Sequence, residues 1–389
     1  MAIRWPPRNR CLFLLFALLN SLACIVFMML FFDAGKSGGL FESSAEGLSE
    51  GSDKNSRQLT GDNRMLSPAR RQPVNRQNEK DSFRRKGPDA VLKGYQNFLG
   101  NKSVKFQCNQ CAIVTSSGQL LGTGAGREID SNDCVLRMNN APTKGHEEDV
   151  GSRTTIRVVG HINFGRIFGD DPAFVEEIFV NASTKTDSVV IHWSYLTDID
   201  TRPPKEYALA VKLAQTHPNV SFNMFTPQKM VYAEDLFLHE TGLIRSRAKT
   251  WMSTGWYTFL LAMDSCKQIN VYGMIWGDYC TEHPDKEVPY HYYGPAFKAE
   301  CRYYHASETR LTGGHLFIME KAVFGRWAYA HNIRFHYPLW PARKLRPDHS
   351  GLLTPFMLRY QAAQNRLFSK LAFWKLFFHF SGLFYPLVH

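Results

Sequence analysis

The chain has 389 residues, of which 44% are apolar, and a formal net charge of +11. The apolar share is ordinary for a globular protein and excludes a chain that is disordered throughout, while the length allows one large domain or two small ones. The excess of Lys and Arg favours acidic partners, which include nucleic acid, phosphate-bearing donors, acidic glycans and anionic membranes.

Residues 11–32 form an uncharged apolar run that is long enough to span a bilayer. Arg4, Arg8 and Arg10 precede this run, so residues 1–10 should be a cytoplasmic tail and the rest of the chain should lie in the lumen. A cleaved signal peptide is the alternative, but its apolar region would be shorter and a small-residue cleavage site would follow it. We therefore expect a single N-terminal transmembrane signal-anchor.

Residues 33–90 are rich in Ser, Gly, Asn and charged side chains. Such a segment cannot bury enough surface to offset the entropy of ordering, so we expect a flexible luminal stem. Its basic run is interpreted as a solvated linker rather than a nucleic-acid patch, because the expected topology puts it in a lumen, and no nucleic-acid partner is predicted. Three sequons, at Asn101, Asn181 and Asn219, fit a glycosylated luminal domain in which disulfides can form.

The folded domain is expected over residues 91–346. Three short strands are predicted near its start, each followed by small or polar residues. They cover residues 112–114, 134–138 and 155–159, and the residues that follow them include Ser116, Asn139 and Gly160. This pattern is typical of an α/β sheet with a ligand crevice at the strand ends. Residues 122–126 do not complete a GxGxxG pattern, so no dinucleotide site is predicted.

Helices and strands should alternate between Phe164 and Val231, with a strand at 188–193 and a helix at 205–215. Asp198 and Asp200 form a DxD pattern, which can hold a metal on a nucleotide diphosphate. A pattern of this length is common by chance, so we interpret these residues as solvated loop acids and predict no metal site.

A capped helix is predicted after residue 253. Apolar residues recur at helical spacing from Trp256 to Cys266 and give one apolar face. Ser253 and Thr254 precede this pattern, at positions where Ser and Thr cap the N-terminus of a helix. Gly255 lets a ligand approach the first free amides, which bind phosphate or carboxylate. The alternative to an anion-binding helix is a capped helix of the core that binds no ligand and is followed by a strand at 269–274.

Two histidines lie in settings that suit chemistry. His291 stands among tyrosines, where it either packs or presents a donor to a phosphate. His315 and Glu320 do not share a face of one helix, so we expect His315 on a loop and Glu320 inside the helix that follows. A histidine at a loop–helix junction suits a general base, although alone it is more often structural.

These segments resemble, in the same order, the sialylmotifs of the animal sialyltransferases, glycosyltransferase family 29. The long motif matches residues 111–161, the short motif 253–274, the third motif 291–294, and the very short motif His315 with Glu320. The stretches at 137–151 and 289–293 are most similar to the N-acetylgalactosaminide α2,6-sialyltransferases. Within these, the subgroup that acts on already sialylated Gal-GalNAc cores and on gangliosides is the nearest.

The resemblance implies a Rossmann-like α/β domain of the variant GT-A type behind a Golgi membrane anchor, with the catalytic part luminal. The donor would be CMP-sialic acid and the acceptor a glycoprotein or a glycolipid. No metal or other cofactor would be required, and self-association is left open.

The resemblance also implies roles for single residues. The donor would be held by Ser116, Ser117, Gly118, Asn139, Ser253, Thr254, Gly255 and Gly273. His291 and Tyr292 would contact the leaving phosphate, and His315 would be the base. Such a base is needed because the acceptor hydroxyl must lose its proton as it attacks sialic acid C2 with inversion.

Six of the eight cysteines lie beyond residue 100, which allows many pairings. The resemblance implies the bonds Cys111–Cys266 and Cys280–Cys301. Cys108 and Cys134 remain, and whether they pair with each other is left open.

Two positions depart from the nearest subgroup. Gly294 stands where an acid is frequent, and residues 193–195 stand where Trp-Gly-Pro is frequent, so the exact acceptor and linkage stay open. Residues 347–389 extend past the usual end, and their bulky apolar stretch could lie at a membrane interface, on a partner, or as an extra helix on the domain. An inactive lectin-like or partner-organising protein is the alternative function, against which the intact His291 and His315 argue.

Overall fold

The computed structural model describes residues 94–100, 102–193, 205–294, 299–310, 312–345, 354, 356–363, 365–367 and 369. All of them belong to one compact unit, Val74–His389. The expected anchor, stem, Asn101, the Asp198–Asp200 pair and most of the C-terminal extension lie outside the described residues. Among the described helices, none combines the length and the apolar character needed to cross a bilayer.

An eight-stranded sheet runs through the unit in the order β1-β6-β5-β4-β3-β2-β7-β8. The strands are β1 (Tyr95–Asn97), β2 (Cys108–Val114), β3 (Cys134–Met138), β4 (Thr154–Gly160), β5 (Thr186–His192), β6 (Ser221–Phe225), β7 (Cys266–Tyr272) and β8 (Ile333–His336). The β1–β6 pair is antiparallel and the other pairs are parallel. The predicted α/β sheet is therefore confirmed, and β1, β6 and β8 are additions to the strands named from the sequence.

The five predicted strands are all present, with two corrections at their ends. The strand expected to reach Trp193 ends at His192, and the strand expected to reach Met274 ends at Tyr272. The second difference has a clear cause, because Gly273 turns the chain with φ +79°. A side chain there would be strained and would also meet Leu120, whose Cγ would lie 2.6 Å from the added Cβ.

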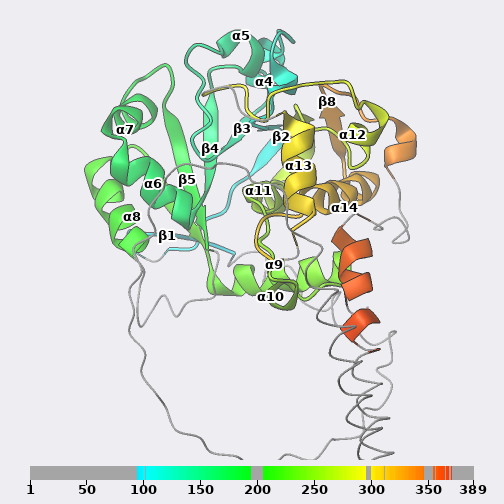
Figure 1. Cartoon of the computed structure of the whole chain (residues 1–389). Coiled ribbons are helices and arrows are strands. Elements are labelled where there is room, and N and C mark those ends of the chain that lie inside the picture. Colours follow the sequence, from blue (N-terminus) through cyan, green and yellow to red (C-terminus); the bar gives the residue numbers. More distant parts are fainter. Residues whose placement is uncertain are drawn as a thin grey trace, which may run out of the picture. The chain divides into compact units, whose positions relative to one another are not determined.

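The labelled helices are α4 (Gly126–Asp130), α5 (Glu147–Val150), α6 (His161–Asp170), α7 (Pro172–Phe179), α8 (Lys205–Thr216), α9 (Pro227–Thr241), α10 (Arg245–Ala248), α11 (Thr254–Ser265), α12 (Tyr279–Glu282), α13 (Glu300–Glu308) and α14 (Phe317–Ala330), and residues 356–363 are also helical. Figure 1 shows α6, α7 and α8 on the β5 side of the sheet and α12, α13 and α14 on the β7–β8 side. The helix predicted at 205–215 is confirmed as α8.

Helix α11 is buried more completely than its sequence predicts. Every residue from Trp256 to Ala262 is buried, rather than one apolar face, and Cys266 belongs to β7 instead of the helix. The sheet covers one side of α11, and α14 covers another, where Phe259 stacks on Phe324 with ring centroids 4.0 Å apart. A helix that is covered on several sides gives a rigid base for whatever its N-terminus holds.

The order of the strands reverses beside β2. From β2 the chain adds β3, β4, β5 and β6 on one side, and then returns to place β7 and β8 on the other side. Ligands of open parallel sheets bind at such a reversal, outside the carboxyl ends of the strands. Thr115, Asn139, His161, Trp193 and Gly273 each follow directly on one of these strand ends.

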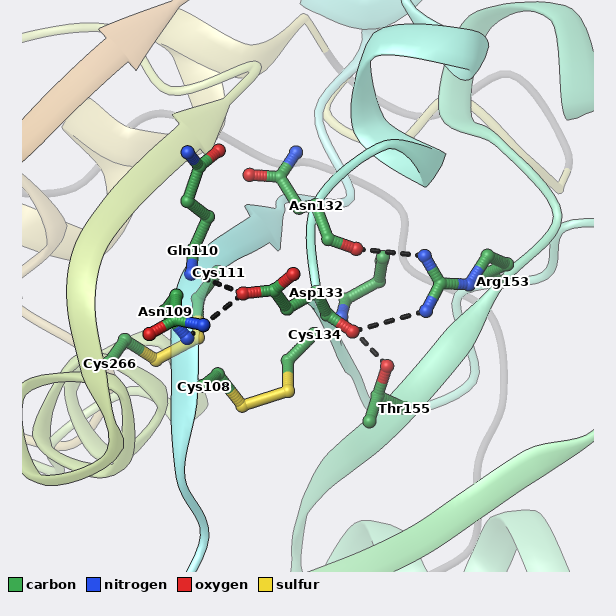
Figure 2. Close-up of a disulfide and its surroundings, with 11 residues drawn as sticks. Cys108, Asn109, Gln110, Cys111, Asn132, Asp133, Cys134, Arg153, Thr155 and Cys266 are labelled. Atoms are coloured by element: carbon green, nitrogen blue, oxygen red, sulfur yellow. Dashed lines mark hydrogen bonds between the residues drawn. A yellow bond between two sulfur atoms is a disulfide. The ribbon is translucent and has the colours of Figure 1, made fainter.

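Three disulfides close the domain. Cys111–Cys266 and Cys280–Cys301 confirm the expected pairs, and Cys108–Cys134 is the third bond. Figure 2 shows two of these bonds side by side at the amino ends of β2, β3 and β7, where the Asp133 carboxylate also accepts hydrogen bonds from the amides of Asn109 and Gln110. These two bonds thus join the strands at the edge of the sheet opposite to their carboxyl ends.

Two of the three sequons lie in described parts of the chain. The side chains of Asn181 and Asn219 are exposed, on the turns before β5 and β6. Both are accessible to a glycosylating enzyme, and glycosylation at Asn101, Asn181 and Asn219 stays a prediction.

Candidate active site

The N-terminus of α11 is held by a buried carboxylate. Ser253 caps the helix, since its Oγ accepts a hydrogen bond from the Trp256 amide at 3.2 Å. Glu320, only 1% exposed, accepts a hydrogen bond from the Ser253 amide at 2.8 Å and a second from the Ser253 hydroxyl. Glu320 lies inside α14, as predicted, and therefore fixes the turn that carries Thr254 and Gly255.

His315 lies on the loop directly before α14, as the sequence predicts. Its Nδ1 is 2.9 Å from the carbonyl oxygen of Trp251. A carbonyl oxygen can only accept, so Nδ1 carries the proton and Nε2 is left with a lone pair. Ser307 fixes the backbone of this residue, because its hydroxyl donates to the His315 carbonyl at 2.7 Å and accepts from the His315 amide at 3.1 Å.

Burial lowers the pKa of the His315 imidazole below its ordinary value, against the hydrogen bond to Trp251, which raises it. The ring is therefore neutral at pH 7. A neutral imidazole with a proton on Nδ1 and a free Nε2 is arranged to accept a proton from a hydroxyl.

A cavity of about 180 Å³ joins His315 to the α11 turn. It is lined by Gly160, Ile162, Asn163, His192, Trp251, Met252, Thr254 and His315. Thr254 and His315 were predicted site residues, and the other six were not. Asn139 stands beside the cavity, since its Oδ1 accepts a hydrogen bond from Nδ2 of the lining residue Asn163 at 3.3 Å.

Asn139 is held in an unusual backbone conformation by a buried arginine. Its φ is +49°, a region that side chains other than Asn and Asp rarely adopt. Nη1 of Arg157, which is fully buried in β4, donates to the carbonyl oxygens of Asn139 at 2.8 Å and Ala141 at 3.0 Å. The buried side chain of Arg157 thus fixes the backbone conformation of this loop.

A second group of predicted residues gathers at the ends of β2 and β7. The Gly118 amide donates to the Pro289 carbonyl at 3.0 Å, and the Tyr292 amide donates to the Ser116 carbonyl at 2.9 Å. An added Cβ at Gly118 would lie 2.6 Å from the Pro289 oxygen, so only glycine fits this approach. Ser117 caps the short turn at Gly118–Leu120, and Thr115 donates to the Gly273 carbonyl at 2.9 Å.

The two residues expected at the leaving phosphate lie in this second group. His291 is half-buried between Tyr290 and Tyr293, and burial lowers its pKa to about 4, so that its ring is neutral. The hydroxyl of Tyr292 donates to the Pro142 carbonyl at 2.6 Å, and burial raises its pKa to about 12. Neither residue belongs to the described lining of the His315 cavity, and their contact with a phosphate stays a prediction.

His192 is the functional candidate that the sequence interpretation missed. Its Nε2 lies 3.3 Å from Oγ1 of Thr254, and its ring stacks on Tyr257 at a centroid distance of 3.9 Å. Burial is the main cause that lowers the pKa of His192 well below its ordinary value, so the ring is neutral. Gly160 makes room for it, because a Cβ there would lie 3.2 Å from this nitrogen. The sequence does contain a signal for His192, because it is a polar residue at the end of an apolar strand, where ligands of parallel sheets bind.

The mostly parallel sheet, the reversal of strand order beside β2 and the neutral histidine that lines a small cavity define an α/β protein with a proton-accepting site at the carboxyl edge of its sheet. Comparison with known proteins gives the class more closely. The sequence model of glycosyltransferase family 29 (sialyltransferase) matches residues 66–326.

Several known sialyltransferases are similar in sequence to this chain. Alpha-N-acetylgalactosaminide alpha-2,6-sialyltransferase 3 of Rattus norvegicus is 41% identical over 250 residues, which cover 64% of this chain and 79% of that protein. An alpha-N-acetyl-neuraminyl-2,3-beta-galactosyl-1,3-N-acetyl-galactosaminide alpha-2,6-sialyltransferase of Mus musculus is 36% identical over 264 residues, which cover 66% of this chain and 71% of that protein. A crystal structure of a mammalian sialyltransferase aligns with 59% of this chain and 68% of that chain at 21% identity and a TM-score of 0.36. The chain belongs to glycosyltransferase family 29 and is a sialyltransferase.

Proposed function

We propose that this enzyme transfers sialic acid from CMP-sialic acid to a hydroxyl of GalNAc, with α2,6 linkage and inversion at C2. The relatives whose names specify this linkage and this acceptor sugar support the assignment. The acceptor is carried by an O-glycan or by a ganglioside, and the enzyme works in the Golgi lumen behind its N-terminal anchor.

One observation carries the proposed chemistry. The free Nε2 of His315 shares a cavity with Thr254, which begins a long helix whose first amides lack intrahelical partners. In the proposed reaction the acceptor oxygen bonds to C2 while the bond from C2 to the phosphate oxygen breaks. The acceptor proton passes to Nε2 of His315, and CMP leaves with the bonding electron pair.

The donor would lie along the carboxyl ends of β3, β2 and β7. Its carboxylate would meet Thr254 and Gly255 at the positive end of α11, where an anion is stabilised by the helix dipole and by the free amides. Its nucleotide would lie toward Ser116, Ser117, Gly118 and Gly273, and Asn139 would stand between the two. His291 and Tyr292 border the nucleotide part and would meet the charge of the leaving phosphate.

Transfer is expected to need no divalent metal, since the leaving group carries a single phosphate whose charge can be met by protein donors. The full chain, purified in detergent from a secretory host, should transfer sialic acid from CMP-sialic acid to GalNAc-bearing acceptors equally fast with and without EDTA. Mass-spectrometric linkage analysis of the product identifies the α2,6 bond. Loss of activity in EDTA that Mn²⁺ restores would contradict the metal-free mechanism, and glycan binding without any transfer would favour a lectin-like protein.

His192 is expected to orient the Thr254 hydroxyl toward the donor. The change His192→Phe keeps a ring on Tyr257 but removes the nitrogen, and a lost hydrogen bond of about 1 kcal/mol should raise KM for CMP-sialic acid about fivefold. His192→Gln, which keeps a polar group, should be affected less. Steady-state kinetics at saturating acceptor measure both values, and an unchanged donor KM in the Phe variant would show that His192 only packs.

A further inference from the structure

We propose that Glu300 is a positioning residue for the donor, and that it fixes the turn beside the nucleotide without contacting the nucleotide itself. The proposal rests on the proposed function, in which Ser117 and Gly118 lie beside the nucleotide of CMP-sialic acid. Glu300 begins α13 and is only 1% exposed, which is too little to contact a ligand directly. It lies between the third motif and the very short motif, outside the segments to which the sequence assigned a role.

The carboxylate of Glu300 uses one oxygen for the turn and the other for its own helix. Its Oε2 accepts a hydrogen bond from Nε2 of Gln119 at 3.1 Å, and Gln119 is the middle residue of the turn Gly118–Leu120. Its Oε1 accepts a hydrogen bond from the hydroxyl of Tyr304 at 2.6 Å, one turn further along α13. Because both oxygens are bound in a buried site, the carboxylate is a fixed acceptor, and the Gln119 side chain is held with it.

The backbone of Glu300 is joined to the same turn by a second route. Its amide donates to the Val288 carbonyl at 2.7 Å, and the carbonyl of the next residue, Pro289, accepts from the Gly118 amide at 3.0 Å. The start of α13, the segment that leads to His291 and the turn at Gly118 are therefore joined to one another. Loss of the Gln119 hydrogen bond would free the side-chain route and leave the backbone route in place.

Helix α14 supports this arrangement from the other side. Lys321 is 5% exposed, and its Nζ lies 3.7 Å from the centre of the Tyr304 ring. Burial raises the pKa of Glu300, and the charge of Lys321 opposes this rise. Lys321 directly follows Glu320, whose carboxylate fixes Ser253 at the start of α11. Two consecutive residues of α14 thus act on the two turns between which the donor is proposed to lie.

The first test removes each hydrogen bond of the Glu300 carboxylate in turn. Gln119→Leu removes the amide that binds Oε2, and Tyr304→Phe is the matched control that removes the hydroxyl bound to Oε1. Loss of a hydrogen bond to a charged group should raise the Kd for CMP about tenfold in Gln119→Leu, and the control should stay within about twofold of the wild-type enzyme. Calorimetric titration of the full-length enzyme measures Kd, and steady-state kinetics should show kcat and the acceptor KM of Gln119→Leu within about twofold. An unchanged Kd in Gln119→Leu, or an equal rise in both variants, would overturn the proposal.

The second test asks whether Glu300 and Gln119 act through one hydrogen bond. Glu300→Met removes the carboxylate at similar volume, and the double variant with Gln119→Leu should then bind CMP no more weakly than the weaker of the two single variants. Additive losses would mean that the two side chains act separately, and would overturn the proposal. If Glu300→Met does not fold, the comparison of Gln119→Leu with Tyr304→Phe decides alone.

These measurements separate the proposal from the proposed function, because CMP binding needs no acceptor. A wild-type enzyme that binds CMP but makes another linkage contradicts the proposed function alone. Wild-type affinity for CMP in Gln119→Leu contradicts positioning by Glu300 alone, and a wild-type enzyme that does not bind CMP overturns both.

Discussion

Replacement of His315 by alanine should lower kcat by about a thousandfold while binding of CMP changes little. General-base catalysis contributes a factor of about a hundred to ten thousand to the rate. Among the described residues that line the cavity, His315 is the one whose Nδ1 is fixed by a backbone carbonyl, that of Trp251, so that its Nε2 can accept a proton. The nucleotide is expected near Ser117 and Gly273, at the ends of other strands, so the affinity for CMP should be retained. Steady-state kinetics and calorimetric titration with CMP measure the two quantities.

A matched control tests positioning instead of chemistry. Ser307→Ala removes the side chain that fixes the backbone amide and carbonyl of His315 but leaves the imidazole in place. Its kcat should fall by much less, about tenfold, and its pH profile should keep the same shape. If His315→Ala turns over at the wild-type rate, the base is another residue and the proposed reaction fails.

The pH profile follows from the same ring. The base must be neutral to accept the proton, so kcat falls as the pH drops through its pKa. Burial lowers the pKa of His315. The acid limb of the kcat profile should therefore lie below about pH 6.5, the ordinary value for histidine. An acid limb above that value in the wild-type enzyme would contradict the assignment.

Much of the fold could be predicted from the sequence, because its strands and helix caps depend on residues that are close together in the chain. All five residues of β3 are buried and four of them are apolar, so the strand is recognised in the sequence although Arg137 interrupts the apolar run. Ser253 is a side-chain cap directly before an apolar helix, and His315 precedes the helix that contains Glu320. Such features depend on neighbours a few positions away, and the order of motifs then ties them to one family.

The parts that were missed depend on contacts between distant segments. His192 meets Thr254 only because β5 ends near the start of α11, and no spacing in the sequence records that approach. The role of Glu320 is of the same kind, since its carboxylate reaches Ser253 from a separate helix. The hydroxyl of Tyr292 is bound to the Pro142 carbonyl, which a motif cannot disclose. Local sequence patterns thus predicted the helices and strands, whereas the hydrogen bonds between them are known only from the structure.

The second large effect is expected at Glu320. Glu320→Ala removes two hydrogen bonds to Ser253 and leaves Lys321, which is only 5% exposed, with one fewer buried carboxylate near it. Loss of this acceptor leaves the amide and the hydroxyl of Ser253 without it, and each buried donor left unsatisfied costs about 1–3 kcal/mol of unfolding free energy. The loosened turn at Thr254 should also lower kcat/KM for the donor about a hundredfold, because positioning of the reacting groups is lost. Glu320→Gln keeps an oxygen that can accept from the Ser253 amide, so both losses should be smaller.

The pH dependence of stability separates Glu320→Gln from the wild-type enzyme. Burial raises the pKa of Glu320 to about 7, against the hydrogen bonds from Ser253, so the folded state holds this proton more tightly than the unfolded state. The stabilising contribution of the protonated form is complete below the unfolded pKa near 4.5 and is lost as the pH rises through about 7. Glu308, whose pKa is also raised to about 7, adds a slope of the same sign in every variant. Thermal unfolding from pH 5 to pH 8 should therefore show a smaller loss of stability in Glu320→Gln than in the wild-type enzyme. Identical slopes would mean that Glu320 is ionised throughout, and that its two hydrogen bonds outweigh its burial.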